Sequence, residues 1–529
     1  MSSSRVLAYH EVSKHSPESV RRSSRGLDWP NKPFPYKDYA PGLRSISLSM
    51  PDAPLPVSAL DAVAGLGLAT VRDLDAGEVG RILNYGAGVM RKRPISRTQA
   101  MYFRTYASAG GLYPVEVYAV AGDLPTRRLE GRLGPTRRLE GRLGPTRRLE
   151  GRLGRGLAAG LYHYHPRRRA LVALREGDYR GSLVDATASE PTVAEAPLTL
   201  VLTGIPWRTA WKYGPRGFRH LYWDAGMIVA NILALATAAG LPARVVLGFD
   251  DAALQRLLGI DGRHEFPLCL LSIGSGSPVP PAAPAPDLAL GTRPLSAEEI
   301  EYPQIVAAQD AGRLHAGDVA AWRGSSGRTG PPLEATLGPG DLLEDVIRRR
   351  GSARSFDARP MPAGALGTIL DRSTRGVPTD VAPAGSALAQ PYLIANRVEG
   401  LKAGVYRYDE AFHLLAAGDF AEQAAYLCLE QRLGHDAAAA HFLMVDLGDV
   451  LDRFGDRGYR VAQLEAGVLA GRMYLAAEAH RVGATGLTFY DDDVARFFSG
   501  AAEGDPRAPK SCMLVLAVGP ATRRLLPLA

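Results

Sequence analysis

Apolar and polar positions along the chain predict a mixed α/β protein. Residues 115–120 alternate apolar and polar side chains, with β-branched and aromatic types among them, which is typical of a strand. Residues 221–239 contain little polarity, so we expect a long core helix there. A second helix is expected at 75–90. Further strands are expected at residues 160–164, 197–203 and 266–274.

The length of 529 residues predicts two to four domains. Composition divides the chain into an N-terminal extension (1–70), a first α/β domain (71–275), a Pro/Gly-rich linker (276–340) and a second domain (341–529). Within the linker, residues 296–311 predict a short helix.

The second domain repeats the first. Residues 212–219 read KYGPRGFR, and residues 453–460 read RFGDRGYR. The same spacing then runs without a gap to residues 249–251 and 490–492. Two copies of one fold predict a fused dimer packed about a pseudo-two-fold axis. Two independent domains joined by a linker are the alternative.

The composition is that of a globular protein, with 46% hydrophobic and 22% charged residues. No run of 18 or more apolar residues is present, so we expect no segment that spans a membrane. Three cysteines in so long a chain argue against a disulfide framework and favour a reducing, cytoplasmic location. Cys269 and Cys512 stand in apolar strand-like runs, so we expect buried, inert thiols.

The net charge of +7 is concentrated in one insertion. Residues 125–154 are the decapeptide PTRRLEGRLG written three times, and each copy carries three Arg and one Glu. The insertion therefore supplies +6, and the rest of the chain about +1 (7 minus 6). This distribution does not indicate nucleic-acid binding. We expect an exposed loop, with a phosphate- or peptide-binding arm as the alternative.

One stretch of small residues precedes the strand at 115–120. Ser108, Ala109, Gly110 and Gly111 allow the backbone to lie flat against a planar group and to offer it N–H donors. A loop of this kind before a strand is a plausible seat for a ring system. An ordinary turn is the alternative.

The residues around this loop resemble a known family. Arg104 followed by SAGGLYP at 108–114 resembles the R-x-x-P-S-A-G-A-L-Y-P signature of SagB-type dehydrogenases, with Ala107 in place of Pro. These enzymes are the FMN-dependent branch of the nitroreductase superfamily that oxidises azolines in ribosomal peptides. The resemblance implies two tandem nitroreductase-like domains of α+β class. It also implies that residues 108–111 and Leu112 lie against a flavin held mainly by the other half.

The second domain opens with an element similar to the R-x-S-x-R(K) motif of nitroreductases, formed by Arg350, Ser352 and Arg354. The resemblance implies that these residues hold the ribityl chain, the phosphate and the pyrimidine edge of the flavin. Arg suits this task because its forked donors stay charged. No equivalent is evident near residues 80–92, unless the triplet Arg21, Ser23 and Arg25 serves.

The two halves have diverged in complementary ways. The first keeps the small-residue loop, while the corresponding loop at 382–388 lacks the Leu-Tyr-Pro ending. The second keeps R-x-S-x-R. We therefore predict one complete composite site, and one FMN per chain, at the interface between the halves. The resemblance implies further flavin contacts with less specific motifs, at Thr485, Gly486, Leu487, Gln431 and Arg523 or Arg524.

Lys212 and Tyr213 are the predicted catalytic residues. SagB-type enzymes have a Lys-Tyr pair at this place, implicated in azoline oxidation. Dehydrogenation removes a proton as well as a hydride, and either side chain needs a lowered pKa to act as a base near neutrality. The second half has Arg453 and Phe454 instead, and neither can serve as a base there. A surface Lys beside an aromatic anchor is the alternative.

The sequence thus predicts an FMN-dependent oxidoreductase that converts azolines to azoles in a ribosomal peptide, with O₂ reoxidising the flavin. The resemblance allows for cyclodehydratase-type partner subunits and for a peptide or small-molecule substrate. One rival is an NAD(P)H-dependent reductase of nitro compounds or quinones. Another is a flavin-free scaffold subunit of a peptide-modifying complex. No metal, nucleic-acid or membrane partner is expected.

Overall fold

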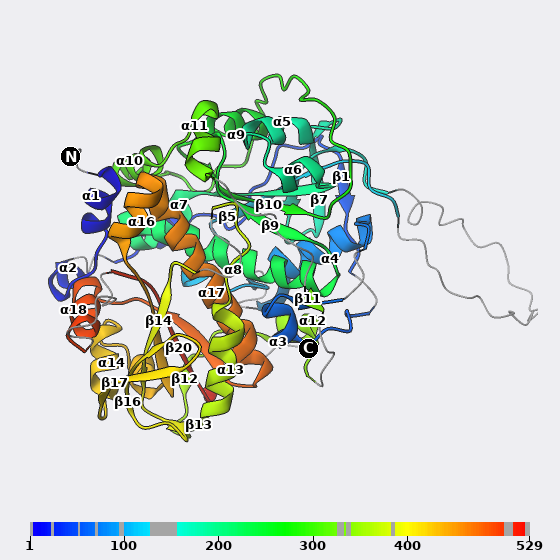
Figure 1. Ribbon diagram of the computed structural model, residues 1–529. Coiled ribbons are helices and arrows are strands. Elements are labelled where there is room, and N and C mark those ends of the chain that lie inside the picture. Colours follow the sequence, from blue (N-terminus) through cyan, green and yellow to red (C-terminus); the bar gives the residue numbers. More distant parts are fainter. Residues whose placement is uncertain are drawn as a thin grey trace, which may run out of the picture.

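The computed structural model arranges the chain as two similar halves, the first drawn mainly in cyan and green and the second in yellow to red (Figure 1). It describes residues 4–22, 26–50, 53–68, 72–94, 100–126, 156–324, 333–334, 340–381, 387–501 and 511–523. The predictions for Ser23 and Arg25, most of the decapeptide repeat, residues 382–386 and Arg524 lie outside the described residues.

An antiparallel seven-stranded sheet, of order β1-β7-β6-β5-β8-β10-β9, forms the centre of the first half. Alternate side chains of β5 enter two separate cores, Val117 and Ala119 on one face and Tyr118 and Val120 on the other. Every residue of β5 is therefore buried. The strands are β1 (Ser45–Ser47), β5 (Val115–Ala121), β6 (Gly160–His165), β7 (Ala170–Glu176), β8 (Leu198–Gly204), β9 (Ala243–Val246) and β10 (Phe266–Ile273).

The second half contains a six-stranded antiparallel sheet of order β17-β16-β14-β18-β20-β19. Each of its strands has a counterpart at the same place in the first sheet, in the order β7-β6-β5-β8-β10-β9. The duplication predicted from the sequence is therefore confirmed in the topology, with β1 as an addition. The strands are β14 (Gln390–Ala395), β16 (Gly404–Tyr408), β17 (Phe412–Ala417), β18 (Ala439–Val445), β19 (Gly483–Leu487) and β20 (Ser511–Gly519).

Helices and short paired strands complete each half. In the first half these are α4 (Ala76–Ala87), the hairpin β3 (Val89–Pro94) and β4 (Ala100–Arg104), α5 (Arg180–Ala186), α6 (Pro191–Glu195), α7 (Pro206–Tyr213), α8 (Gly217–Ala238) and α9 (Asp251–Leu258). In the second they are α12 (Leu343–Arg349), β12 (Ser355–Phe356), β13 (Met361–Pro362), α13 (Ala363–Thr374), β15 (Val398–Glu399), α14 (Ala421–Leu427), α15 (Arg432–Asp436), α16 (Leu447–Phe454), α17 (Gly458–Ala479), α18 (Asp491–Ala501) and β21 (Ala521–Arg523).

The long helices α8 and α17 cross at the centre of the molecule (Figure 1). Each has 22 residues, and they occupy equivalent positions in the two halves. At the crossing, Gly226 faces its own counterpart, Gly467. A Cβ on Gly226 would lie 2.5 Å from the carbonyl carbon of Gly467, so the two backbones are in direct contact. This contact makes the halves a pseudo-dimer rather than independent domains.

Buried ion pairs link the two halves reciprocally. Arg216 of the first half lies 2.7 Å from Asp491 of the second. Its counterpart Arg457 lies 2.6 Å from Asp251 of the first half. The neighbours Arg219 and Arg460 join the same two carboxylates. This is the pattern of an isologous interface, in which each subunit presents the same patch to the other.

The N-terminal extension packs across the junction of the halves. From α1 (Arg5–Val12), the Tyr9 hydroxyl donates to the Pro215 carbonyl at 2.8 Å, and His10 Nδ1 lies 3.1 Å from the Tyr459 hydroxyl. His10 is thus a packing residue. The other elements of the extension are α2 (Pro17–Arg22), η1 (Trp29–Asn31), α3 (Ala59–Val63) and β2 (Leu66–Gly67).

The linker differs from its prediction. The expected helix at 296–311 begins only at Pro303, because the Trp207 indole N–H donates to the Ser296 hydroxyl at 2.8 Å and the segment before Pro303 lies against α7 without forming a helix. A Pro fits the first turn of a helix, where no N–H is needed. The linker contains α10 (Pro303–Ala311), α11 (Ala316–Arg323) and β11 (Leu333–Glu334).

One helical stretch has the length and composition of a membrane span. The continuous helical stretch Pro206–Ala238 is long and apolar enough to cross a membrane by length and composition. Its most apolar window is 94% buried inside the protein, as a core helix would be.

Cys269, Cys428 and Cys512 are all buried, and burial raises the pKa of each thiol.

Candidate functional site

The small-residue loop is a rigid turn with an open face. Gly110 and Gly111 have φ of 62° and 65°, a conformation that favours glycine. Arg104 braces the turn from behind, with its backbone N–H donating to the Tyr113 hydroxyl at 3.2 Å and its guanidinium stacked on the Tyr113 ring. Both glycines are exposed, whereas Leu112 and the strand that follows are buried.

Asp224 on α8 anchors this loop. One carboxylate oxygen accepts a hydrogen bond from the Ser108 hydroxyl, and the other accepts from the Ala109 N–H at 3.1 Å. The Tyr113 N–H donates to the same Ser108 oxygen at 2.9 Å. Burial raises the pKa of Asp224 to about 7, against the lowering effect of these hydrogen bonds.

Glu465 on α17 does the same in the second half. It is the sequence counterpart of Asp224, and it accepts from the N–H groups of Leu388 at 2.6 Å and Ala389 at 2.8 Å. Burial raises the pKa of Glu465, again to about 7. Each half therefore holds its loop with one buried carboxylate.

Lys212 and Tyr213, at the end of α7, lie directly against the loop. A Cβ on Gly110 would be 3.1 Å from the Tyr213 hydroxyl and 3.4 Å from Cδ of Lys212. A side chain at position 110 would therefore crowd the pair, and the positive φ of Gly110 also favours glycine. The structure thus places the predicted catalytic residues and the predicted ring-binding loop side by side.

The two side chains have opposite pKa shifts. The pKa of Lys212 is lowered by partial burial and then by the charges of Arg354 and Lys32. The pKa of Tyr213 is raised by burial and by Asp224. Lys212 is therefore the member of the pair suited to accept a proton, and Tyr213 keeps its proton as a hydrogen-bond donor.

The R-x-S-x-R element of the second half meets the first half near this loop. Arg350 Nε donates to the Thr105 carbonyl at 3.2 Å, and Arg91 of β3 donates to the Arg350 carbonyl. The effect of Arg354 on the pKa of Lys212 is a further link between the halves. The structure thus brings the R-x-S-x-R element of the second half close to the small-residue loop of the first half.

Arg350 fits an anionic ligand. It is 4% exposed, and its Nη1 has no hydrogen-bond partner among the described residues. Within the same residues, no carboxylate forms an ion pair with it. A second cation lies beside it, because burial and Arg350 together lower the pKa of Arg91 to about 10. The buried Arg350 guanidinium, with Arg91 beside it, is suited to a phosphate or to the electron-rich edge of a flavin.

The segment containing Thr485, Gly486 and Leu487 lies beside Ser352. Ser352 is bridged to Ala484 on β19, and the Gly486 N–H donates to the Tyr474 hydroxyl at 2.7 Å. Tyr474 in turn lies 3.3 Å from the Ser352 hydroxyl, and Arg350 stacks on its ring. A Cβ on Gly486 would meet nothing closer than 3.9 Å, so this surface is open.

Two other predicted contacts are less direct. The backbone of Arg523 pairs with Ser355 through β12 and β21, which brings the last strand next to the R-x-S-x-R element. The Gln431 amide is used locally, since it donates to the Cys428 carbonyl at 2.7 Å and to the Thr488 hydroxyl at 3.1 Å. Its hydrogen bonds hold the turn after Leu487.

In the second half, the counterpart of Tyr213 is Phe454, and the linker packs against it. Trp322 of α11 packs on Phe454 and donates to its carbonyl at 2.8 Å. Asp380 accepts from the N–H groups of Leu247 and Gly248 beside β9, at 2.8 and 2.9 Å. An indole and an acidic side chain thus pack against Phe454, the counterpart of Tyr213, and against the residues that follow β9.

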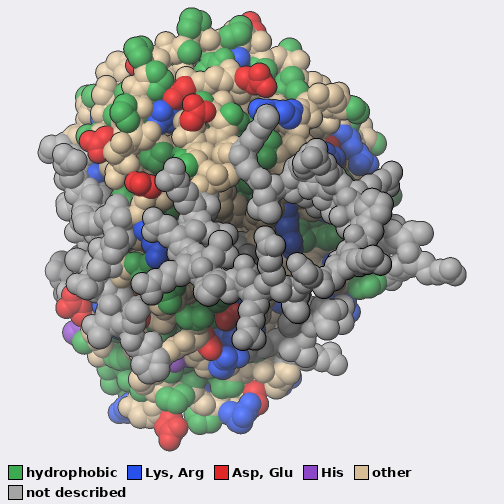
Figure 2. Space-filling view, turned by 90° about the vertical axis from the view of Figure 1, so that its right-hand side faces the viewer, with side chains coloured by type: hydrophobic (Ala, Val, Ile, Leu, Met, Phe, Trp, Pro, Cys, Tyr) green, Lys and Arg blue, Asp and Glu red, His purple; other side chains and the backbone are tan. Residues whose placement is uncertain are grey.

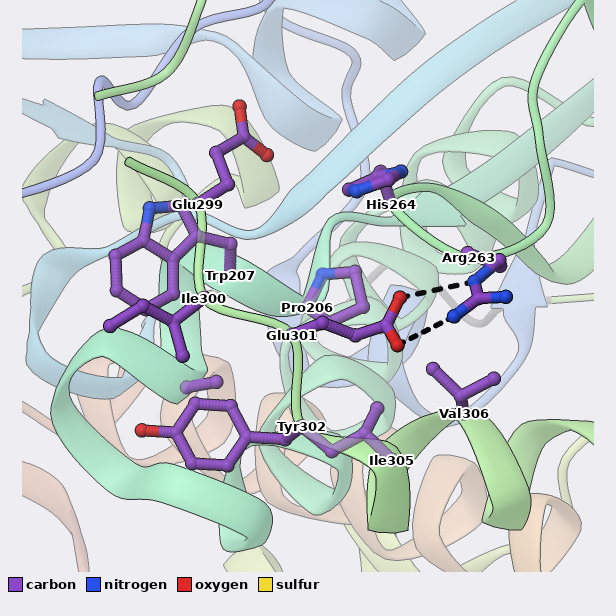
Figure 3. Close-up of a pocket in the computed structure, with 11 residues that line it drawn as sticks. Pro206, Trp207, Arg263, His264, Glu299, Ile300, Glu301, Tyr302, Ile305 and Val306 are labelled. Carbon is purple, nitrogen blue, oxygen red and sulfur yellow. Dashed lines mark hydrogen bonds and ion pairs between the residues drawn. The ribbon is translucent and has the colours of Figure 1, made fainter. Parts of the chain in front are cut away.

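A small hollow on α7 is distinct from this site. Figure 3 shows it between Pro206 and Trp207 and the linker residues 299–302, with the Arg263–Glu301 ion pair along one side. Its volume is about 20 Å³, which is room for one water molecule. It is too small for a flavin or a peptide.

On the face shown in Figure 2, acidic and basic side chains lie interspersed over the described part. No group of three or more metal-ligating side chains occurs within the described ranges.

Comparison with known proteins now identifies the family. The sequence profile of the nitroreductase family matches residues 72–275 and 347–519, which together exceed half of the chain. The chain belongs to the nitroreductase family. Members of this family are flavin-dependent oxidoreductases, so this protein is a nitroreductase-family oxidoreductase with two tandem domains of that type.

Individual relatives agree with this. A protein of Methanocaldococcus jannaschii described as a nitroreductase is 27% identical over 172 residues, which are 32% of this chain and 70% of that one. A crystal structure from Anabaena variabilis, also described as a nitroreductase, has a TM-score of 0.71 and 24% identity over 98% of this chain and 99% of that chain. It shares the tandem fold.

A third match is weaker. A chain of the E. coli microcin synthetase complex covers 51% of this chain and 91% of its own length, with 18% identity and a TM-score of 0.28. A score this low carries no argument about function.

Sequence reasoning missed several residues of this nitroreductase-family site. Asp224 could have been found, since it lies in the repeated Asp-Ala-Gly and Glu-Ala-Gly segments. No local sequence motif marks Arg91 or Tyr474. Arg91 meets Arg350 only because the two halves pack together, whereas Tyr474 meets it through the fold of the second half.

The buried carboxylates give a testable pH dependence. A folded-state pKa of about 7 for Asp224 means that its contribution to stability is full below the ordinary carboxyl pKa and is lost as the pH rises through 7. Asp224→Asn should therefore gain about 2–3 kcal/mol in unfolding free energy relative to wild type between pH 5 and pH 8, at about 1.4 kcal/mol per pH unit. Chemical denaturation at four pH values measures this.

Two further variants control the measurement. Glu465→Gln should show the same trend, because its pKa is raised in the same way. Gly364→Ala, which changes no titratable group, should show a constant difference from wild type. A constant difference for Asp224→Asn would contradict a pKa near 7.

Proposed function

We propose that this nitroreductase-family protein is a SagB-type, FMN-dependent dehydrogenase that converts azolines to azoles in a ribosomally made peptide. The observation that carries the proposal is the position of Lys212 and Tyr213 against Gly110, facing the R-x-S-x-R element of the other half. A reductase of small molecules has no need for a base at this place. Cyclodehydratase-type subunits that make the azoline are the expected partners.

FMN would be held by Arg350, Ser352 and Arg354 from one half and by residues 108–112 from the other. The open surface at Gly111 and Gly486 suits a planar ring, and the unpartnered Nη1 of Arg350 suits an anion. When bound, FMN supplies the hydride acceptor, with O₂ as the final oxidant.

The protein supplies proton transfer and orientation. An azoline loses one hydrogen as hydride and a second as a proton. The amine of Lys212, with its lowered pKa, accepts that proton. The Tyr213 hydroxyl keeps its own proton and donates a hydrogen bond to the substrate ring.

The halves are expected to form one such site in each chain. Trp322 and Asp380 fill the pseudo-symmetric place, and Asp380 would repel a phosphate there. The purified protein should therefore be yellow and release one FMN per chain, measured from the visible spectrum after denaturation and the protein concentration. Two tightly bound FMN would contradict the single site.

The rival readings give different results in the same preparation. An NAD(P)H-dependent reductase requires that NADH or NADPH bleach the bound flavin anaerobically, and we expect no bleaching. A scaffold subunit would stay colourless with excess FMN. Arg350→Met should lower FMN affinity at least tenfold, because it removes the buried guanidinium from the site.

A further inference from the structure

His220 and Asp224 lie one turn apart on the same face of α8. Each is 3% exposed. This face is directed at the end of α7, where the His220 and Tyr213 ring centroids are 4.1 Å apart. The helix thus presents a polar pair to the predicted catalytic tyrosine.

The His220 ring is held between aromatic side chains. It is tilted by 34° against Tyr213, and it meets Trp223 edge-on at 4.6 Å. Asp224 holds the loop on which the Tyr213 hydroxyl rests. The position of the phenol is therefore fixed by His220 at its ring and by the Asp224-anchored loop at its hydroxyl.

Neither ring nitrogen of His220 has a hydrogen-bond partner among the described residues. Buried polar atoms nearly always have a partner, and leaving one without costs free energy. We therefore infer that the nitrogens bind a molecule other than the chain itself. The charged or titratable groups acting on the ring are Arg216, His15, Arg219 and Lys212, and with burial they lower the pKa of His220 well below its usual value. The ring is neutral and offers one acceptor nitrogen.

The second half provides an internal comparison. At the spacing of 241 residues, His220 corresponds to Val461 and Tyr213 to Phe454. The loop-anchoring carboxylate is present in both halves, as Asp224 and Glu465. Both halves thus have the loop-anchoring carboxylate, whereas only the half with the tyrosine has the histidine.

We propose that His220 is a positioning residue that holds the Tyr213 phenol by ring contact and binds water at its free ring nitrogens. This rests on the proposed function, in which Tyr213 donates a hydrogen bond to the substrate. The water satisfies the buried nitrogens and keeps the imidazole in place behind the phenol. Loss of His220 leaves Tyr213 chemically intact but wrongly oriented.

The test separates position from activity. In protein labelled with 3-fluorotyrosine, the Tyr213 ¹⁹F resonance is assigned from Tyr213→Phe, without flavin or substrate. His220→Val, which copies Val461, should move or broaden that resonance. Val461→Ala, the matched change in the second half, should leave it in place. An unmoved Tyr213 resonance in His220→Val would overturn the proposal.

Kinetics and flavin binding complete the test. His220→Val should lower kcat at least tenfold with KM and the FMN dissociation constant within about twofold. His220→Phe, which keeps a ring but loses the nitrogens, should recover the resonance position and only part of kcat. Full kcat in His220→Phe would overturn the role of the nitrogens. A wild-type protein without azoline oxidation would refute the proposed function, while the resonance still tests the positioning.

Discussion

Lys212→Arg and Tyr213→Phe should each lower the rate of azoline oxidation roughly 100-fold or more, while the protein still binds FMN. Each substitution copies the residue that the second half has at the equivalent place, Arg453 or Phe454. Both changes conserve size and shape, so the loop and its anchor at Asp224 should stay intact. The measurement is turnover of a peptide azoline together with the FMN content of each variant.

The two losses have different physical causes. Arg stays protonated near neutral pH and cannot accept the substrate proton, whereas the Lys212 amine has a lowered pKa. Phe lacks the hydroxyl that lies against Gly110, so the substrate ring loses its hydrogen-bond donor. Lys212→Arg should therefore remove the base, and Tyr213→Phe should remove the polarising donor.

The second half supplies the matched controls. Arg453→Lys and Phe454→Tyr make the reverse changes at the equivalent positions. Because Trp322 fills that region, neither should change turnover by more than about twofold. Wild-type rates in both Lys212→Arg and Tyr213→Phe would remove the pair from the mechanism.

Gly226→Val should destabilise the protein by about 3 kcal/mol or more, or prevent its folding. A Cβ at this position would lie 2.5 Å from three backbone atoms of α17, at Leu464, Gly467 and Val468. Backbone atoms in the middle of a buried helix cannot move aside as a side chain can. The helices would have to separate, and the contacts between the halves would weaken along their length.

Gly226→Ala provides a milder version, with an expected loss of about 1–3 kcal/mol in denaturant unfolding. Gly364→Ala on α13 is the control, because a Cβ there meets nothing within 4 Å. That variant should gain up to about 1 kcal/mol, since Ala favours a helix more than Gly does. Equal stability of the Gly226 and Gly364 variants would contradict close contact at the crossing.

Much of the fold could be predicted from the sequence because its signals are local or periodic. The strand at 115–120 appears as β5, and the core helix at 221–239 appears as α8, extended to begin at Gly217. The constant spacing of 241 residues predicted the pseudo-dimer. The predicted start of the helix at 296–311 was wrong, because a tertiary contact of Ser296 holds the residues before Pro303 outside the helix.

The candidate site was harder to predict in full. Short motifs indicated residues 108–112 and the R-x-S-x-R element, but they said nothing about how the two would meet. Arg91, Thr105 and Tyr474 surround Arg350 through contacts between distant parts of the chain. The pKa of Tyr213 also depends on burial and on Asp224, neither of which is visible in a Lys-Tyr dipeptide.

The linker through α10 and α11 makes the union of the two halves an intramolecular step. Ordinary dimers obey mass action, and their subunits separate on dilution. Here each half experiences a high effective concentration of the other, whatever the amount of protein in the cell. The pairing is also always between unlike halves. Every molecule therefore brings the R-x-S-x-R element of its second half to the small-residue loop of its first half.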